Sequence, residues 1–110
     1  MGRRRRINYR DKGPKPPMDA LTAIAFAREA FELRHPERPA DFWRYTGTTG
    51  RGPDRDGNFE IGFCWQRKDS NHGADGFFEV RVRGWNAATT VLLDAFPADF
   101  NPDDHELYDP

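Results

Sequence analysis

The stretch GRGPDRDGNFEIGF, residues 50–63, joins a turn to the clearest strand signal of the chain. Asp56-Gly57 supplies the positive φ angles that a hairpin turn needs. Apolar and polar side chains then alternate from Phe59 to Trp65. A period of two predicts a strand over residues 58–67, with one face buried and the other face in water.

The same turn is also rich in oxygen ligands, because acids and an amide recur at alternate positions from 54 to 60. Calcium sites use such ligands, but an EF-hand needs a twelve-residue loop that ends in a bidentate Glu. Arg51 and Arg55 would also lie against the cation. The sequence therefore favours a hairpin turn over a metal site, and we expect no metal and no cofactor.

Two further strands are predicted around this one. Residues 42–48 form the first, with Trp43 and Tyr45 on one face, and residues 77–83 form the third, with Phe78, Val80 and Val82 pointing inward. Strands joined by short loops indicate an antiparallel meander.

Helical patterns lie on both sides of the meander. Asp19 is a suitable N-cap for a helix over residues 20–33, which Pro36 ends. Residues 85–96, WNAATTVLLDAF, combine β-branched residues with helical spacing, and we predict a helix capped by Asn86 and stopped by Pro97. The predicted fold class is α+β: a single small domain with an antiparallel three-stranded sheet and one or two packed helices, in the order α-β-β-β-α.

Charge divides the chain into a basic flexible arm (1–17), the α+β domain (18–96) and an acidic C-terminal tail (97–110). Residues 1–16 carry seven positive side chains against one acid, and residues 94–110 carry six acids without Lys or Arg. No apolar run approaches the ~20 residues that cross a bilayer. Cys64 is the single cysteine, so no internal disulfide forms. We expect a cytoplasmic protein that does not contact membranes.

Catalytic motifs are missing from the sequence. There is no P-loop, no paired CxxC, no HExxH and no serine elbow. His35, His72 and His105 are far apart in the chain, and none is next to a nucleophile. Cys64 alternates with the apolar face of a strand, where an unreactive thiol is common, although a fold could still bring it to a histidine. We therefore expect a protein that is not an enzyme.

Nucleic acid is the favoured partner. The arginines of the arm fit phosphate, Tyr9 offers a stacking surface, and two more arginines lie on the predicted hairpin. A solubilising tail is the simpler alternative for the arm. The residues predicted to contact nucleic acid are Arg3, Arg4, Arg5, Arg6, Tyr9, Arg10, Arg51 and Arg55.

The hairpin and the element order together resemble the double-stranded-RNA-binding domain, in which a Gly-Pro-x-His loop precedes a Phe-x-Val-x-Val strand. The matching positions, over a likeness that covers residues 19–96, are Gly52, Pro53, Arg55, Phe59, Ile61 and Phe63. The resemblance implies a loop that enters the RNA minor groove and a first helix that contacts the next groove. Its lysine cluster at the start of the last helix is absent, because NAATT (86–90) stands there.

The acidic end indicates an alternative function. A row of acids among aromatic residues imitates a phosphate row and fits a protein with a basic groove, as in the small inhibitors or assembly factors of phages and mobile elements. The same acids could instead pair with the chain's own basic groups. The residues predicted for this protein-binding face are Asp99, Asp103, Asp104 and Glu106.

Overall fold

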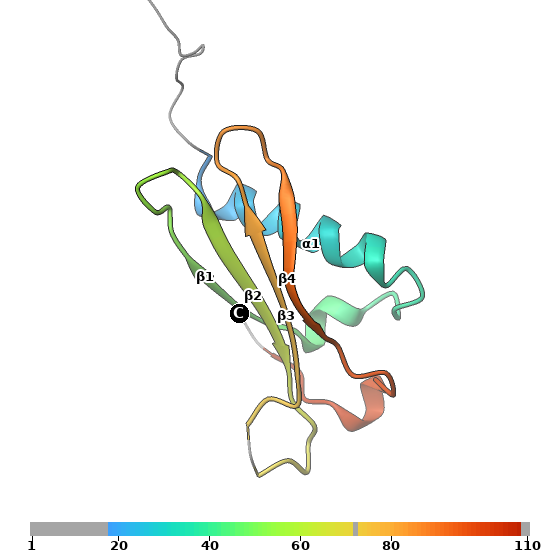
Figure 1. Ribbon diagram of the computed structural model, residues 1–110. Helices are drawn as coiled ribbons and strands as arrows, with labels where there is room; N and C mark the ends of the chain where they lie inside the picture. The colour runs from blue at the N-terminus through green and yellow to red at the C-terminus, as the bar shows by residue number, and fades with distance from the viewer. Residues whose placement is uncertain (1–17, 72, 109–110) are drawn as a thin grey trace, which may run out of the picture.

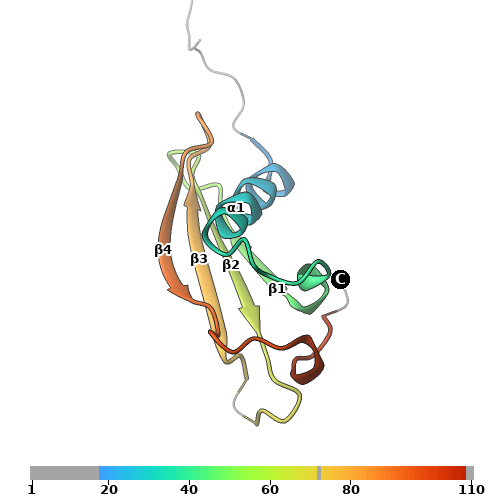
Figure 2. The same ribbon diagram turned by 90° about the vertical axis from the view of Figure 1, so that its right-hand side faces the viewer.

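One helix packs across one face of a four-stranded antiparallel sheet in the computed structural model (Figures 1 and 2). The structure describes residues 18–71 and 73–108. The strands lie in the order β1-β2-β3-β4, each next to its neighbour in the chain. The elements are α1 (Ala20–Arg34), the 3-10 helix η1 (Phe42–Tyr45), β1 (Gly47–Arg51), β2 (Phe59–Trp65), β3 (Gly76–Val82), β4 (Thr89–Ala95) and the 3-10 helix η2 (Pro102–Asp104).

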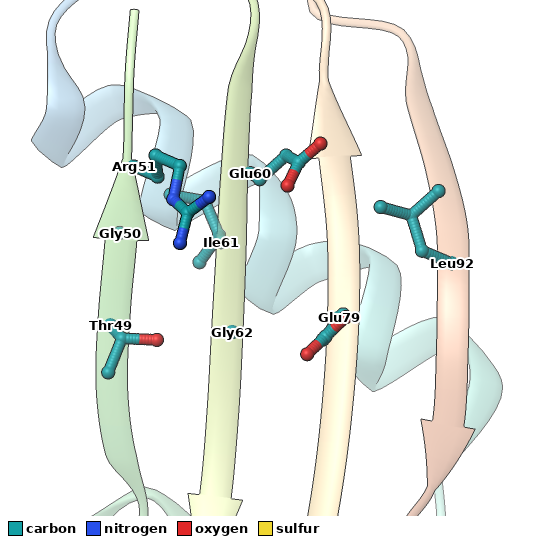
Figure 3. Close-up of a pocket in the computed structure, with 8 residues that line it drawn as sticks. All are labelled: Thr49, Gly50, Arg51, Glu60, Ile61, Gly62, Glu79 and Leu92. Carbon is teal, nitrogen blue, oxygen red and sulfur yellow. The ribbon is translucent and has the colours of Figure 1, made fainter.

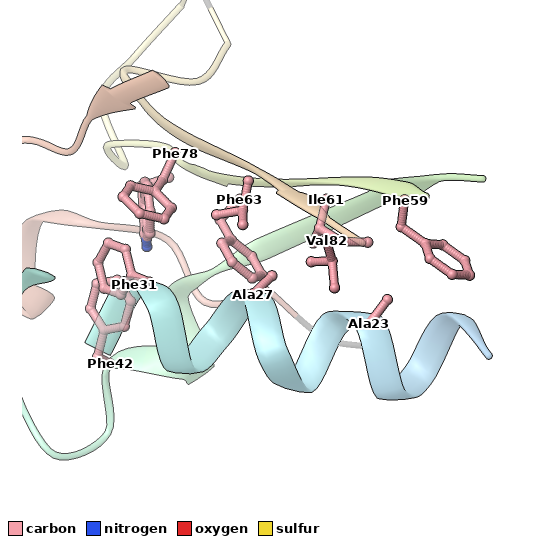
Figure 4. Packing of buried hydrophobic residues seen from close by; sticks show 11 residues of the cluster. Ala23, Ala27, Phe31, Phe42, Phe59, Ile61, Phe63, Phe78 and Val82 are labelled. Carbon is pink, nitrogen blue, oxygen red and sulfur yellow. The ribbon is translucent and has the colours of Figure 1, made fainter. Parts of the chain in front are cut away.

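Helix α1 begins as predicted, because the Asp19 carboxylate accepts a hydrogen bond from the Thr22 N–H at 2.8 Å. Ala23, Ala27 and Phe31 form its buried face. The two alanines are small, so the helix backbone lies close to the sheet, and Phe31 fills the wider space beyond them (Figure 4). None of the helices in the described part of the chain has the length and apolar character needed to cross a membrane.

Phe31 is the centre of an aromatic core. Its ring centroid lies 4.9 Å from that of Phe78, 5.0 Å from that of Phe42 and 5.4 Å from that of Trp65. All four residues are fully buried. The buried Trp65 Nε1–H donates to the Thr46 hydroxyl at 2.9 Å, so the polar group of this ring is satisfied inside the core.

The second and third predicted strands are confirmed. Along β2 and β3, buried and accessible residues alternate as a half-buried sheet requires. The strands pair in register from Phe59 opposite Val82 to Trp65 opposite Gly76. The side chains that point toward α1 are Phe59, Ile61, Phe63, Trp65, Phe78, Val80 and Val82.

The prediction of a strand over residues 42–48 is wrong for most of its length. Phe42–Tyr45 is a 3-10 helix, and β1 begins only at Gly47. The tight turn directs Phe42 into the core, while the Trp43 Nε1–H donates to Glu32 at 2.8 Å beside α1. The sequence of β1, GTTGR, contains no apolar residue, so no alternation marks it. Its pairing with β2 makes it a strand.

The prediction of a helix over residues 85–96 is also wrong, and the sheet has four strands instead of three. Thr89–Ala95 form β4, which pairs with the edge of β3. A helix would have left that edge without backbone partners. The segment has both the β-branched residues of a strand and the apolar spacing of a helix. Because β4 is mostly exposed, its apolar and polar residues do not alternate as they do in a half-buried strand. Over the described residues the structure keeps the α+β class with one α-helix, and η2 follows its last strand, β4.

The segment after β4 returns along the body of the domain. Phe100 packs against Phe42 with a centroid distance of 5.1 Å, and His105 is fully buried against Phe100. The backbone of His105 forms a bridge with Arg67, which follows β2. The Tyr108 N–H donates to the Arg44 carbonyl at 2.9 Å. These contacts fix residues 97–108 to the domain.

An ion pair joins the end of α1 to β4. The Asp94 carboxylate lies 2.9 Å from Arg34 Nε and 3.0 Å from His35 Nε2. Burial raises the pKa of Asp94, but hydrogen bonds from Arg34 and His35 lower it more, so the folded pKa lies below the ordinary value of 3.8. The stabilisation that the charged Asp94 gives to the folded state is therefore complete above the unfolded-state pKa. It is lost as the pH falls from there through the folded-state pKa.

We expect Asp94→Asn to lower the free energy of unfolding at pH 7 by about 1 kcal/mol. The difference from the native protein should shrink as the pH falls from about 5 to about 2, because the native carboxylate is then protonated. Urea unfolding at several pH values measures this. Asp103→Asn, an exposed acid, is the control. A difference that stays constant down to the lowest pH would show that the charge of Asp94 contributes nothing.

Candidate functional site

Two hairpin loops meet at one end of the sheet. Because β1 and β3 run in the same direction, the β1–β2 loop and the β3–β4 loop lie side by side, and α1 begins at the same end (Figure 1). Figure 4 shows the same arrangement from the core, where Ala23 of the first helical turns lies near Val82 and Phe59. We call residues 51–58 and 83–88 the loop end. The first described residues, which precede α1, therefore belong to this end of the domain.

Asp54 organises the first loop. Its carboxylate accepts hydrogen bonds from the N–H groups of Asp56 and Asn58, each at 2.9 Å, and its carbonyl accepts from the Gly57 N–H. Gly57 has a φ of 82°, which a residue without a Cβ adopts at little cost. The predicted hairpin turn is confirmed. Within residues 18–71 and 73–108, no three His, Cys, Asp or Glu residues form a group suited to a metal ion.

The two loops are in direct contact. The Trp85 Nε1–H donates to the Asp56 carbonyl at 3.0 Å, and the Gly84 N–H donates to the Asn58 side chain at 3.4 Å. A Cβ on Gly84 would lie 1.8 Å from the Gly57 carbonyl oxygen. Only glycine fits there, so the two loops are held as one unit.

Three exposed arginines lie at the loop end: Arg51, Arg55 and Arg83. None of them forms an ion pair with another described residue. Many other cations of the domain are engaged, as Arg34 is by Asp94 and Arg67 is by Asp75. The loop-end guanidinium groups are therefore available to an anionic partner.

The open face of the sheet has a different charge. Figure 3 shows Arg51 extending from β1 toward β2, level with Glu60 and Ile61, while Thr49 lies beside Gly62 and Glu79 is on β3. These residues line a hollow of about 330 Å³. Glu60 pairs with Arg81 at 3.4 Å, and Glu79 adds a second carboxylate, so this hollow has mixed charge and is not a basic surface suited to phosphate. Arg51 lies at the border of this hollow with the loop end, directly opposite Glu60 in the pairing of β1 with β2.

The predicted acidic residues lie at the opposite end of the sheet. Asp99 pairs with Arg67, whose hydrogen bond lowers the pKa of the Asp99 carboxyl, and Glu106 donates its N–H to Gln66 at the end of β2. Asp103 and Asp104 belong to η2. Asp99 is therefore partly neutralised within the chain, while the other three acids are exposed and form no ion pair with a described residue.

The histidines are separate from one another. His35 bonds to Asp94, and His105 is buried with Nδ1 at 3.0 Å from the Asn101 carbonyl. His72 lies outside the described residues. Cys64 is near Tyr108, whose pKa is raised by burial and then by the neighbouring thiol. No histidine contact with Cys64 is found among the described residues.

Arg51 and Arg55 are the two predicted nucleic-acid contacts that the structure describes. Arg3, Arg4, Arg5, Arg6, Tyr9 and Arg10 lie outside the described residues. Sequence reasoning missed Arg83 and Trp85, because it placed a helix after them. A fourth strand in the predicted meander would have placed their loop beside the first hairpin. Because a helix was predicted instead, residues 83–88 were not recognised as part of the loop end.

Comparisons of the chain with protein-family models, with curated proteins and with solved structures found no match.

Proposed function

We propose that the protein binds nucleic acid, with RNA as the favoured form, through the loop end and the basic segment 1–17, without catalysing a reaction. The observation that carries this proposal is the position of three exposed arginines, none ion-paired with a described residue, at the end of the domain where α1 begins. The sequence carries seven further cations within its first 16 residues.

The chemistry is that of phosphate binding. Each Arg or Lys that neutralises a phosphate releases a condensed counterion, which makes the affinity fall as salt rises. The planar guanidinium also bonds two phosphate oxygens at once. Asp54 and Asp56 lie among the loop-end arginines, although the Asp54 carboxylate is occupied by backbone N–H groups. Most of the affinity is therefore assigned to the basic segment, and the loop end fixes where the strand lies.

RNA is favoured over DNA because the hairpin resembles the loop that double-stranded-RNA-binding domains place in the minor groove. Gly52, Pro53 and Arg55 carry that resemblance. The segment that it assigns to a lysine-rich last helix is β4 in this fold. The proposal for RNA therefore depends on the loop and not on the last element.

The test uses a variant in which Arg51, Arg55 and Arg83 are all changed to Gln. We expect its affinity for a fluorescent RNA of about 20 nucleotides to fall roughly tenfold or more at about 50 mM salt, since three phosphate contacts are lost. Fluorescence anisotropy measures the affinity. Duplex RNA, single-stranded RNA and DNA of equal length are compared in parallel.

A matched control removes cations from the other end of the domain. Lys68 and Arg44 are exposed. The Lys68 N–H donates to the Asp104 carbonyl, and the Arg44 carbonyl accepts from the Tyr108 N–H, so both residues lie near the acidic end. Changing both to Gln should leave the affinity within about twofold of the native value. Equal losses from both sets would mean that only net charge matters, and no loss from the loop-end set would reject this end as the site.

The alternative, a protein-binding role of the acidic end, is favoured by the exposure of Asp103, Asp104 and Glu106. A basic groove on a partner would fit these three carboxylates, and the surface does not overlap the loop end. Neutralising the three acids should abolish such binding, while the loop-end arginine variant should keep it. Asp99 contributes less, because Arg67 already neutralises it.

A further inference from the structure

A recess opens between the two hairpin loops. Its volume is about 550 Å³, and its lining residues are Asp56, Asn58, Arg83, Trp85 and Asn86. Both loops contribute to it, and their contact at Gly57 and Gly84 fixes the distance between its walls. The recess is therefore part of the folded domain and needs no rearrangement to form.

Trp85 provides the main apolar surface of the recess. The residue is 56% exposed, and its Nε1–H is already bonded to the Asp56 carbonyl at 3.0 Å. This hydrogen bond uses the only polar group of the indole and fixes the ring by its edge. A large ring that is held by its edge and accessible to solvent interacts with a ligand by stacking.

The groups around the indole suit a nucleotide. The side-chain oxygen of Asn86 accepts from the Ala88 N–H at 3.0 Å, and that of Asn58 accepts from the Gly84 N–H at 3.4 Å. Each amide therefore keeps its NH₂ group as a donor, and base edges carry carbonyl and ring-nitrogen acceptors. Arg83, exposed and without an ion pair among the described residues, supplies a cation for the adjoining phosphate.

We propose that this recess binds one unpaired base of a nucleic-acid strand, stacked on the Trp85 indole, with Arg83 on a flanking phosphate. The inference rests on the nucleic-acid function proposed above and narrows it to strands with accessible bases. A base inside a duplex has both faces covered by its neighbours, so it cannot stack on a side chain without leaving the helix.

The test uses tryptophan fluorescence. Trp65 is fully buried, and Arg28 lies over the ring of Trp43 at 4.2 Å, so Trp85 is the most exposed of the three tryptophans. The native protein is titrated with a single-stranded oligouridylate of about 12 nucleotides and with an abasic strand of the same length and charge. We expect the oligouridylate to quench the emission and to bind about 5- to 100-fold more tightly than the abasic strand.

Two variants locate the effect. Trp85→Leu should bind the oligouridylate no more tightly than the abasic strand, whereas Trp85→Phe, which keeps a ring, should retain most of the preference. Trp43→Phe should retain the quenching. The midpoint of urea unfolding shows that each variant is folded.

The outcomes separate this inference from the function on which it rests. If both strands bind equally, with strong salt dependence and no effect of Trp85→Leu, the base site is rejected while nucleic-acid binding stands. If neither strand binds, both proposals are rejected. If uridine monophosphate quenches at the same concentration as the oligouridylate, the recess binds a free nucleotide, which overturns the assignment to a strand.

Discussion

Replacement of Phe31 by alanine lowers the free energy of unfolding by about 3–5 kcal/mol. Phe31 has no exposed surface, and its ring contacts residues from η1, β2, β3 and the segment after β4. No neighbour can move into the space without breaking its own contacts, so a cavity remains. Urea unfolding followed by circular dichroism measures the loss.

The control lies two residues away on the same helix. Leu33 is 80% exposed, and Leu33→Ala should change the free energy of unfolding by less than about 0.5 kcal/mol. Phe31→Leu keeps most of the apolar volume and should cost roughly half as much as Phe31→Ala. A loss below about 1 kcal/mol for Phe31→Ala would contradict the aromatic core described above.

Neutralisation of the basic segment has the largest expected effect on binding. With Arg3, Arg4, Arg5, Arg6 and Arg10 changed to Gln, the affinity for RNA at about 50 mM salt should fall by roughly two orders of magnitude, because five phosphate contacts are removed. The dependence of affinity on salt should also become weaker. The measurement is anisotropy at several salt concentrations.

A scrambled segment is the matched control for this change. Residues 1–17 in a permuted order keep every charge and Tyr9, and the contact with phosphates does not depend on sequence. The scrambled protein should therefore bind RNA within about threefold of the native one. Equal losses in the neutralised and scrambled proteins would show a specific sequence contact in place of general electrostatics.

Part of the fold followed directly from local patterns. Asp19 and the helical spacing after it predicted α1, and the alternation from Phe59 to Trp65 predicted β2, because in both segments burial imposes a clear period. Gly57 marked the turn through its need for a positive φ. In these places the local preference and the packing of the whole domain agree.

Two elements could not be found in this way. Strand β1 is GTTGR and carries no apolar period, and β4 is exposed along most of its length. Both are edge strands that exist because β2 and β3 offer backbone partners, which is a tertiary effect. The aromatic residues from Phe42 to Tyr45 suggested a strand by composition, but they fill the core from a 3-10 turn.

The same limit applies to the candidate site. Arg51 and Arg55 were found because they adjoin a recognisable hairpin. Arg83 and Trp85 were missed because they join the site only through the pairing of β3 with β4. The ion pair of His35 with Asp94, which are 59 positions apart in the chain, left no local sequence signal either.

The most direct test of the proposed function is the slope of the logarithm of the binding constant against the logarithm of the salt concentration. It is measured with single-stranded RNA between about 50 and about 200 mM salt. The loop-end arginines and the basic segment together predict a slope of about −4 or steeper, and the Arg51, Arg55 and Arg83 variant should reduce its magnitude by about 2. A native slope near zero, or a slope unchanged in that variant, would contradict the account.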